Sequence, residues 1–148
     1  MSQAVIHGDT IELLQECNAG IKMAVATIDE ILDYVKNRDL KFILSQSKEK
    51  HERLGNETHK LLNEYHDTGK ELSPVAKGMS WLKTNFRLTV NESDSTVADL
   101  ITDGCNMGVK SLRRYLNEYE AAEEKAKDIA KKVISLEEDL IHDIKGYL

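Results

Sequence analysis

Residues 39–65, DLKFILSQSKEKHERLGNETHKLLNEY, decide the fold, because their apolar positions recur every three or four residues. That spacing places the apolar side chains on one face of an amphipathic α-helix. The helix is predicted to start near Asp39 and to stop at Gly69, a residue type that commonly ends helices. Its inward line consists of Leu40, Ile43, Leu44, Ser47, His51, Leu54, Thr58, Leu61, Leu62 and Tyr65.

Three further stretches show the same helical period. The first is predicted to begin with a capping box formed by Asp9 and Glu12 and to end near residue 37. The other two cover residues 97–115 and 126–144. A turn is expected between them, near Glu120, because one continuous helix would be about 75 Å long and could not bury its face against shorter partners.

The connections between these helices set the expected topology. Ser73 and Pro74 have the residue types of an N-cap and a first helical position, so an extra short helix is predicted over residues 74–90. No segment shows a sustained two-residue alternation, so no sheet is expected. The prediction is an all-α, up-down-up-down four-helix bundle, with the extra helix on its second connection.

Composition limits the classes of function. The chain has 148 residues, which suits a single domain over residues 1–148 with a substantial core. Its net charge of −6 argues against nucleic-acid binding, which requires a concentrated basic surface. No secretory signal and no apolar stretch near the roughly 20 residues of a membrane span is visible. A cytoplasmic protein that contacts neither nucleic acid nor membrane is expected.

A short internal similarity links two of the helices. Cys17-Asn18-Ala19-Gly20 in the first helix is echoed by Cys105-Asn106-Met107-Gly108 in the third long one. With Trp81-Leu82-Lys83 between them, this pattern resembles a bacterial branch of the ferritin-like four-helix bundles. The resemblance implies a ferritin-like bundle and says little about chemistry, since members of that branch mostly lack an assigned activity. Relatives often carry an acid after each glycine, whereas this chain has Ile21 and Val109 there.

A di-metal centre can be tested by helical phase. Ferritin-like di-iron sites use a Glu from each of two helices and a Glu-x-x-His pair from each of the other two, all facing inward. Glu-x-x-His occurs nowhere in the chain, and most acids are predicted to point away from the centre. No metal and no cofactor is therefore expected, with iron or manganese as the alternative. The side chains predicted to point outward or to lie on the flanks are Glu12, Glu16, Glu49, Glu52, Glu57, His59, Asp99, Asp103 and His142.

Two polar residues do face inward: His51 and Glu137 lie mid-helix on otherwise apolar faces. In an up-down-up-down bundle their helices would run parallel, and their depths would differ by about 6 Å. Because a buried carboxylate is costly without a partner, the two side chains are predicted to approach each other, directly or through water. A core pair that fixes helix register is the favoured interpretation, and a contact with a small ligand or a single metal ion is the alternative.

Trp81 and Leu88 are seven residues apart, on a different face of the predicted short helix from Val75, Met79 and Leu82. A second apolar face suggests a self-association surface, because exposed apolar patches usually have partners. The favoured function is a non-enzymatic bundle that acts through association, as a homodimer or with another cytoplasmic protein. The alternative is a ferritin-like metal protein with oxidase or iron-handling activity at the bundle centre.

Overall fold

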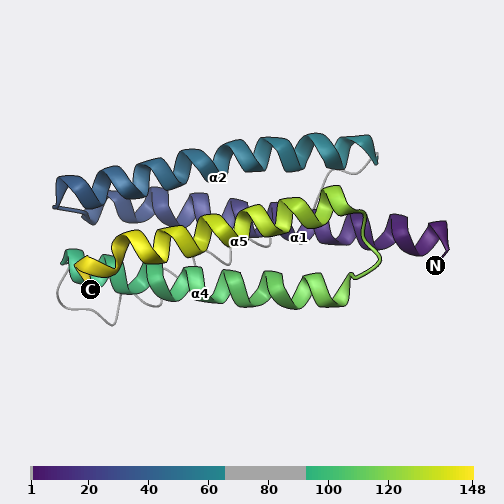
Figure 1. Cartoon of the computed structure of the whole chain (residues 1–148). Helices are drawn as coiled ribbons and strands as arrows, with labels where there is room; N and C mark the ends of the chain where they lie inside the picture. Colours follow the sequence, from purple (N-terminus) through teal and green to yellow (C-terminus); the bar gives the residue numbers. More distant parts are fainter. Residues whose placement is uncertain (1, 66–92) are drawn as a thin grey trace.

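The computed structural model describes residues 2–65 and 93–148, and these residues form four long helices (Figure 1). No strand occurs in these two ranges, so the all-α prediction is confirmed for them. The predicted helix over residues 74–90, with Trp81 and Leu88, lies outside the described residues. The four helices are α1 (Gln3–Ile31), α2 (Arg38–Glu64), α4 (Asp94–Glu118) and α5 (Glu124–Ile144), and short 3₁₀ turns follow α1 and α5 as η1 (Leu32–Tyr34) and η2 (Lys145–Tyr147).

The predicted up-down-up-down order is wrong. In Figure 1, α1 and α5 run in one direction, and α2 and α4 run in the other. The carboxylate of Asp94, at the start of α4, accepts hydrogen bonds from the backbone N–H groups of Lys36 and Asn37 at 2.8 and 3.0 Å. The start of α4 therefore lies beside the start of α2, and the order is up-down-down-up. Apolar periodicity identifies the face that a helix buries but not the direction in which it runs.

Side-chain pairs between α2 and α5 show that these two helices are antiparallel. The Tyr65 hydroxyl donates to Glu123 at 2.5 Å, and Lys132 contacts Glu57 at 3.2 Å, so residue numbers fall along one helix as they rise along the other. The hydrogen bond from Tyr65 lowers the pKa of Glu123. The exposed contact of Lys132 with Glu57 contributes little to stability, about 0–1 kcal/mol. Both contacts report the register of the two helices.

Helix α1 begins earlier than its sequence suggests. Ser2 is the N-cap, and its hydroxyl accepts from the N–H of Val5 at 3.2 Å, so the predicted start at Asp9 is wrong. Asp9 instead accepts from the backbone N–H of Ala121 at 3.1 Å, and the neighbouring Thr10 hydroxyl accepts from that of Glu123 at 2.9 Å. Both residues therefore hold the turn between α4 and α5, which lies at the predicted position near residue 120.

The buried core consists of two separate apolar clusters, one toward each end of the bundle. The first contains Leu13, Leu14, Cys17, Ile21, Leu54, Leu62, Leu112, Ala122, Ala126, Ile129, Ala130, Val133 and Ile134. The second contains Ile28, Ile31, Val35, Leu40, Leu44, Val97, Ala98, Leu100, Ile101, Cys105, Leu140 and Ile144. Each long helix contributes to both clusters, so the two ends of the bundle are joined by all four helices.

Candidate functional site: a buried polar layer

A polar layer lies between the two apolar clusters. On α2, Ser47 and His51 fall between Leu44 of one cluster and Leu54 of the other. On α5, Glu137 falls between Ile134 and Leu140 in the same way. We call Ser47, His51 and Glu137, together with Gly108 of α4, the polar layer. The sequence placed Ser47, His51 and Glu137 on inward faces, and the structure buries all three.

The structure brings His51 and Glu137 together. The His51 side chain is fully buried and that of Glu137 is 9% exposed, and Nε2 of His51 lies 3.4 Å from Oε1 of Glu137. This separation is within ion-pair range but longer than a well-formed N–H···O hydrogen bond. Within the described ranges, Nε2 has no hydrogen-bond partner. The other ring nitrogen, Nδ1, lies 2.8 Å from the backbone carbonyl oxygen of Ser47.

Cys105 of α4 borders the polar layer. Burial raises the pKa of its thiol, and the nearby charge and hydrogen bonding of Glu137 raise it further. Cys17, its counterpart in the sequence similarity, lies instead in the other apolar cluster. There, burial and the charge of Glu16 raise the pKa of Cys17 to about 12. The two cysteines therefore occupy different environments, although both thiols are held in their protonated form.

Thiol reactivity tests this description. At pH 8, both Cys17 and Cys105 are expected to react with a thiol reagent at least about tenfold more slowly in the folded protein than in guanidinium chloride, because the thiolate is the reactive species. The measurement is the rate of labelling with a chromogenic disulfide. Rapid labelling of either residue in the native state would show that its thiol is accessible and ionised.

Gly108 leaves limited room beside Glu137. A methyl group at Gly108 would lie 3.5 Å from Oε1 of Glu137, which is an ordinary van der Waals contact. At Gly55 of α2, a methyl group would lie 3.1 Å from the side chain of Ile21, which is tighter than usual. Glycine at position 55 is therefore needed for the close approach of α1 to α2. Glycine at position 108 is less important, because the polar layer has room for a methyl group there.

Alanine substitutions at Gly55 and Gly108 should consequently have different effects on the stability of the fold. Gly108→Ala is expected to stabilise the fold by up to about 1 kcal/mol, because alanine favours helix over glycine by that amount. Gly55→Ala should recover less of this gain, or lose stability, because Ile21 has to shift. Urea denaturation of both variants measures the difference. Equal gains in both would show that the contact with Ile21 relaxes freely.

The polar layer lacks the donors of a di-metal centre. Among the described residues, Glu137 is the one buried acid, and no group of three or more His, Cys, Asp or Glu side chains is arranged to hold a metal ion. Most acids predicted to point outward are exposed, and Glu12 and Glu16 are partly covered. The exposed ones are Glu49, Glu52, Glu57, Asp99 and Asp103, together with the histidines His59 and His142.

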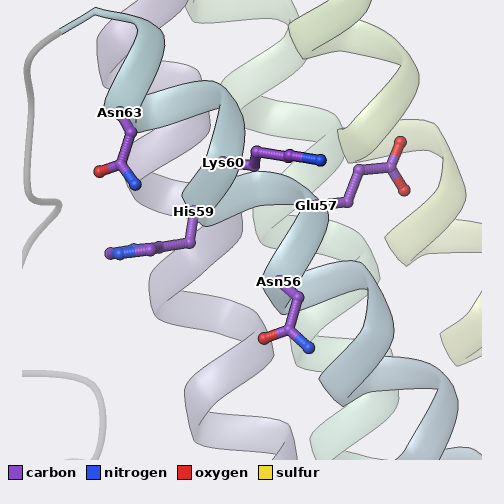
Figure 2. Close-up of a pocket in the computed structure, with 5 residues that line it drawn as sticks. All are labelled: Asn56, Glu57, His59, Lys60 and Asn63. Atoms are coloured by element: carbon purple, nitrogen blue, oxygen red, sulfur yellow. The ribbon is translucent and has the colours of Figure 1, made fainter.

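Two further features bear on where a ligand could bind. Figure 2 shows an open pocket on the outer side of α2, lined by Asn56, Glu57, His59, Lys60 and Asn63. All five residues are exposed and come from one helix, so they surround no enclosed volume. In the part of the chain that the structure describes, no helix has the length and apolar character needed to cross a membrane.

Sequence reasoning missed two buried polar residues of α1, Thr10 and Asn18. Asn18 is almost fully buried, and its side-chain nitrogen has no partner within the described ranges. It follows Leu14 by four residues and precedes Ile21 by three, so its helical phase indicated an inward position. By contrast, the predicted inward Thr58 is buried, and its hydroxyl donates to the Leu54 carbonyl at 2.7 Å.

Comparisons with known proteins support the fold. No family model matches the sequence, and no curated protein matches it. Among solved structures, the chain is similar to a crystal structure of a DUF305 fragment from Deinococcus radiodurans, with a TM-score of 0.72 and 12% sequence identity. The similarity covers 93% of each chain. At this identity the likeness shows a shared helical fold and carries no function from one protein to the other.

Proposed function

We propose that this protein is a metal-free helical bundle that acts through association, with itself or with another cytoplasmic protein. The polar layer is the observation that carries the metal-free part of the proposal. It combines one imidazole with one carboxylate between two apolar clusters, which suits a pair that fixes how α2 and α5 align. A catalytic di-metal site would need about six inward ligands.

We further propose that the bundle is of the ferritin-like kind. Ferritin-like bundles differ from simple up-and-down bundles in having one long crossover connection. Here, the end of α2 and the start of α4 lie at opposite ends of the bundle, whereas each of the other two connections joins helices at one end (Figure 1). This order of helices supports a bundle of the ferritin-like kind. It does not bear on whether the metal ligands of ferritin-like proteins are present.

Elemental analysis of the purified protein tests the metal-free assignment. Iron, manganese and zinc are each expected well below one atom per chain, both as purified and after incubation with the metal salt followed by desalting. The rival function, oxidase or iron-handling chemistry at the bundle centre, requires near-stoichiometric iron or manganese. Retention of one or more atoms per chain would therefore replace the proposed function with the rival one.

The proposed association surface includes Trp81 and Leu88, two apolar residues on one face of the predicted short helix. Sedimentation velocity over a range of concentrations should show a dimer, and replacing both residues by Ala should shift it to monomer. Phe42→Ala is the comparison variant, because Phe42 is a 64% exposed aromatic residue on α2. A dimer that persists without Trp81 and Leu88 but is lost without Phe42 would place the surface on α2 instead.

A further inference from the structure

The hydrogen bonds of His51 determine where its ring protons lie. Nδ1 is 2.8 Å from the backbone carbonyl oxygen of Ser47, and a carbonyl oxygen only accepts hydrogen bonds. Nδ1 therefore carries a proton and donates it. The remaining nitrogen, Nε2, then either bears a second proton or presents a lone pair toward Oε1 of Glu137, 3.4 Å away.

A lone pair on Nε2 facing an ionised carboxylate would be unfavourable in this location. Both atoms would be acceptors, and their burial excludes the water that would otherwise separate them. A single proton removes the conflict, whether it resides on the imidazole or on the carboxyl group. Such a coupled pair is best described by the number of protons it binds rather than by an assignment to one residue.

Neighbouring ionisable groups do not supply this proton. From α4, the Cys105 thiol faces Glu137 and keeps its own proton. From α1, Asp29 forms an ion pair with Lys48 of α2 at 2.7 Å, and Asp29 is mostly exposed. Of the paired basic and acidic side chains in the described residues, His51 and Glu137 are the one pair that is buried on both sides.

We infer that the polar layer is a binding site for one proton, carried either by the His51 ring or by the Glu137 carboxyl group, and that it couples the packing of α2 against α5 to pH. An imidazole in the unfolded chain loses its proton near pH 6.5, while the folded layer keeps one at higher pH. Its contribution to stability is therefore complete below about pH 6.5 and declines as the pH rises above that value. The association proposed above is not needed for this inference.

Glu137→Gln is the decisive variant, because the glutamine side-chain amide can donate to a neutral Nε2 and removes the need for the extra proton. Between pH 6.5 and 8, the unfolding equilibrium constant of the native protein should rise by up to about 30-fold relative to that of Glu137→Gln, the limit for one proton that the native fold retains and the variant does not. Urea denaturation gives both constants. Cys17 and Cys105 are present in both proteins, and ordinary thiols titrate above this range.

Glu57→Gln is the matched control, since it removes an exposed contact between the same two helices, Glu57 with Lys132 at 3.2 Å. Its equilibrium constant should keep a constant ratio to that of the native protein. A ratio of native protein to Glu137→Gln that also stays constant, within about twofold, would overturn the inference. If Glu137→Gln does not fold, calorimetry of the native protein in buffers of different ionisation enthalpy decides at pH 7.5. Release of about one proton on unfolding is expected there, and release of none would contradict the inference.

Discussion

Replacing His51 by Leu is expected to lower the free energy of unfolding by about 3–5 kcal/mol at neutral pH, because it strands the buried carboxylate of Glu137. Glu137 is 7% exposed, so water cannot replace the lost partner. Replacing both His51 and Glu137 by Leu removes the pair as a unit and should restore the native stability or exceed it by about 1–4 kcal/mol. Urea denaturation at pH 7 of both single variants and the double variant measures the effect.

The exposed pair of Glu57 and Lys132 provides the control cycle. It joins the same two helices at 3.2 Å, but both side chains are about half exposed, so its coupling should be below about 1 kcal/mol. A double Leu variant whose loss equals the sum of the two single losses at His51 and Glu137 would contradict the assignment. Such additivity would mean that neither residue depends on the other.

The face that each helix buries could be predicted from the sequence. His51, Ser47 and Glu137 were placed on inward faces from spacing alone, and all three are buried. This succeeds because a helix has a fixed angular step per residue, so one stripe of apolar residues fixes the orientation of every other side chain. The polar layer was thus visible as a polar interruption in two apolar stripes.

The directions of the helices could not be predicted in the same way. The sequence predicts that His51 and Glu137 meet between parallel helices. In the structure, α2 and α5 are antiparallel, and the two residues still lie opposite each other. His51 lies 13 residues after the start of α2, and Glu137 lies seven residues before the end of α5. Both positions fall in the interior of the bundle in either arrangement, so inward phase and mid-helix placement were the informative signals.

The start of α1 shows how a local signal is overridden by tertiary contacts. Asp9 and Glu12 have the spacing of a capping box, yet the helix continues to Gln3. The carboxylate of Asp9 and the hydroxyl of Thr10 are used instead by the turn before α5. Because those contacts join residues more than 100 positions apart, no local pattern could have identified them.

A cavity in either apolar cluster should lower the free energy of unfolding by a large amount, and the losses from cavities in different clusters should add. Leu44 and Leu62 are fully buried on α2, one in each cluster, and replacing either by Ala is expected to cost about 2–5 kcal/mol. They are 18 residues apart, about 27 Å along the helix, so the losses in the double variant should add to within about 0.5 kcal/mol. Since domains have only about 5–15 kcal/mol of stability, the double variant should be largely unfolded without a stabilising co-solvent.

A second double variant within one cluster tests whether the clusters are truly separate. Leu44 and Ile144 belong to the same cluster, so the combined loss of Leu44→Ala and Ile144→Ala should deviate from additivity by about 0.5–3 kcal/mol. All of these variants should still unfold in a single transition, because each of the four helices passes through both clusters and cannot fold at one end alone. Far-ultraviolet circular dichroism in urea follows the transition. Two resolved transitions in Leu44→Ala would show that the polar layer divides the bundle into halves that unfold independently. His51 and Glu137 would then mark a boundary between the two halves rather than a link between α2 and α5.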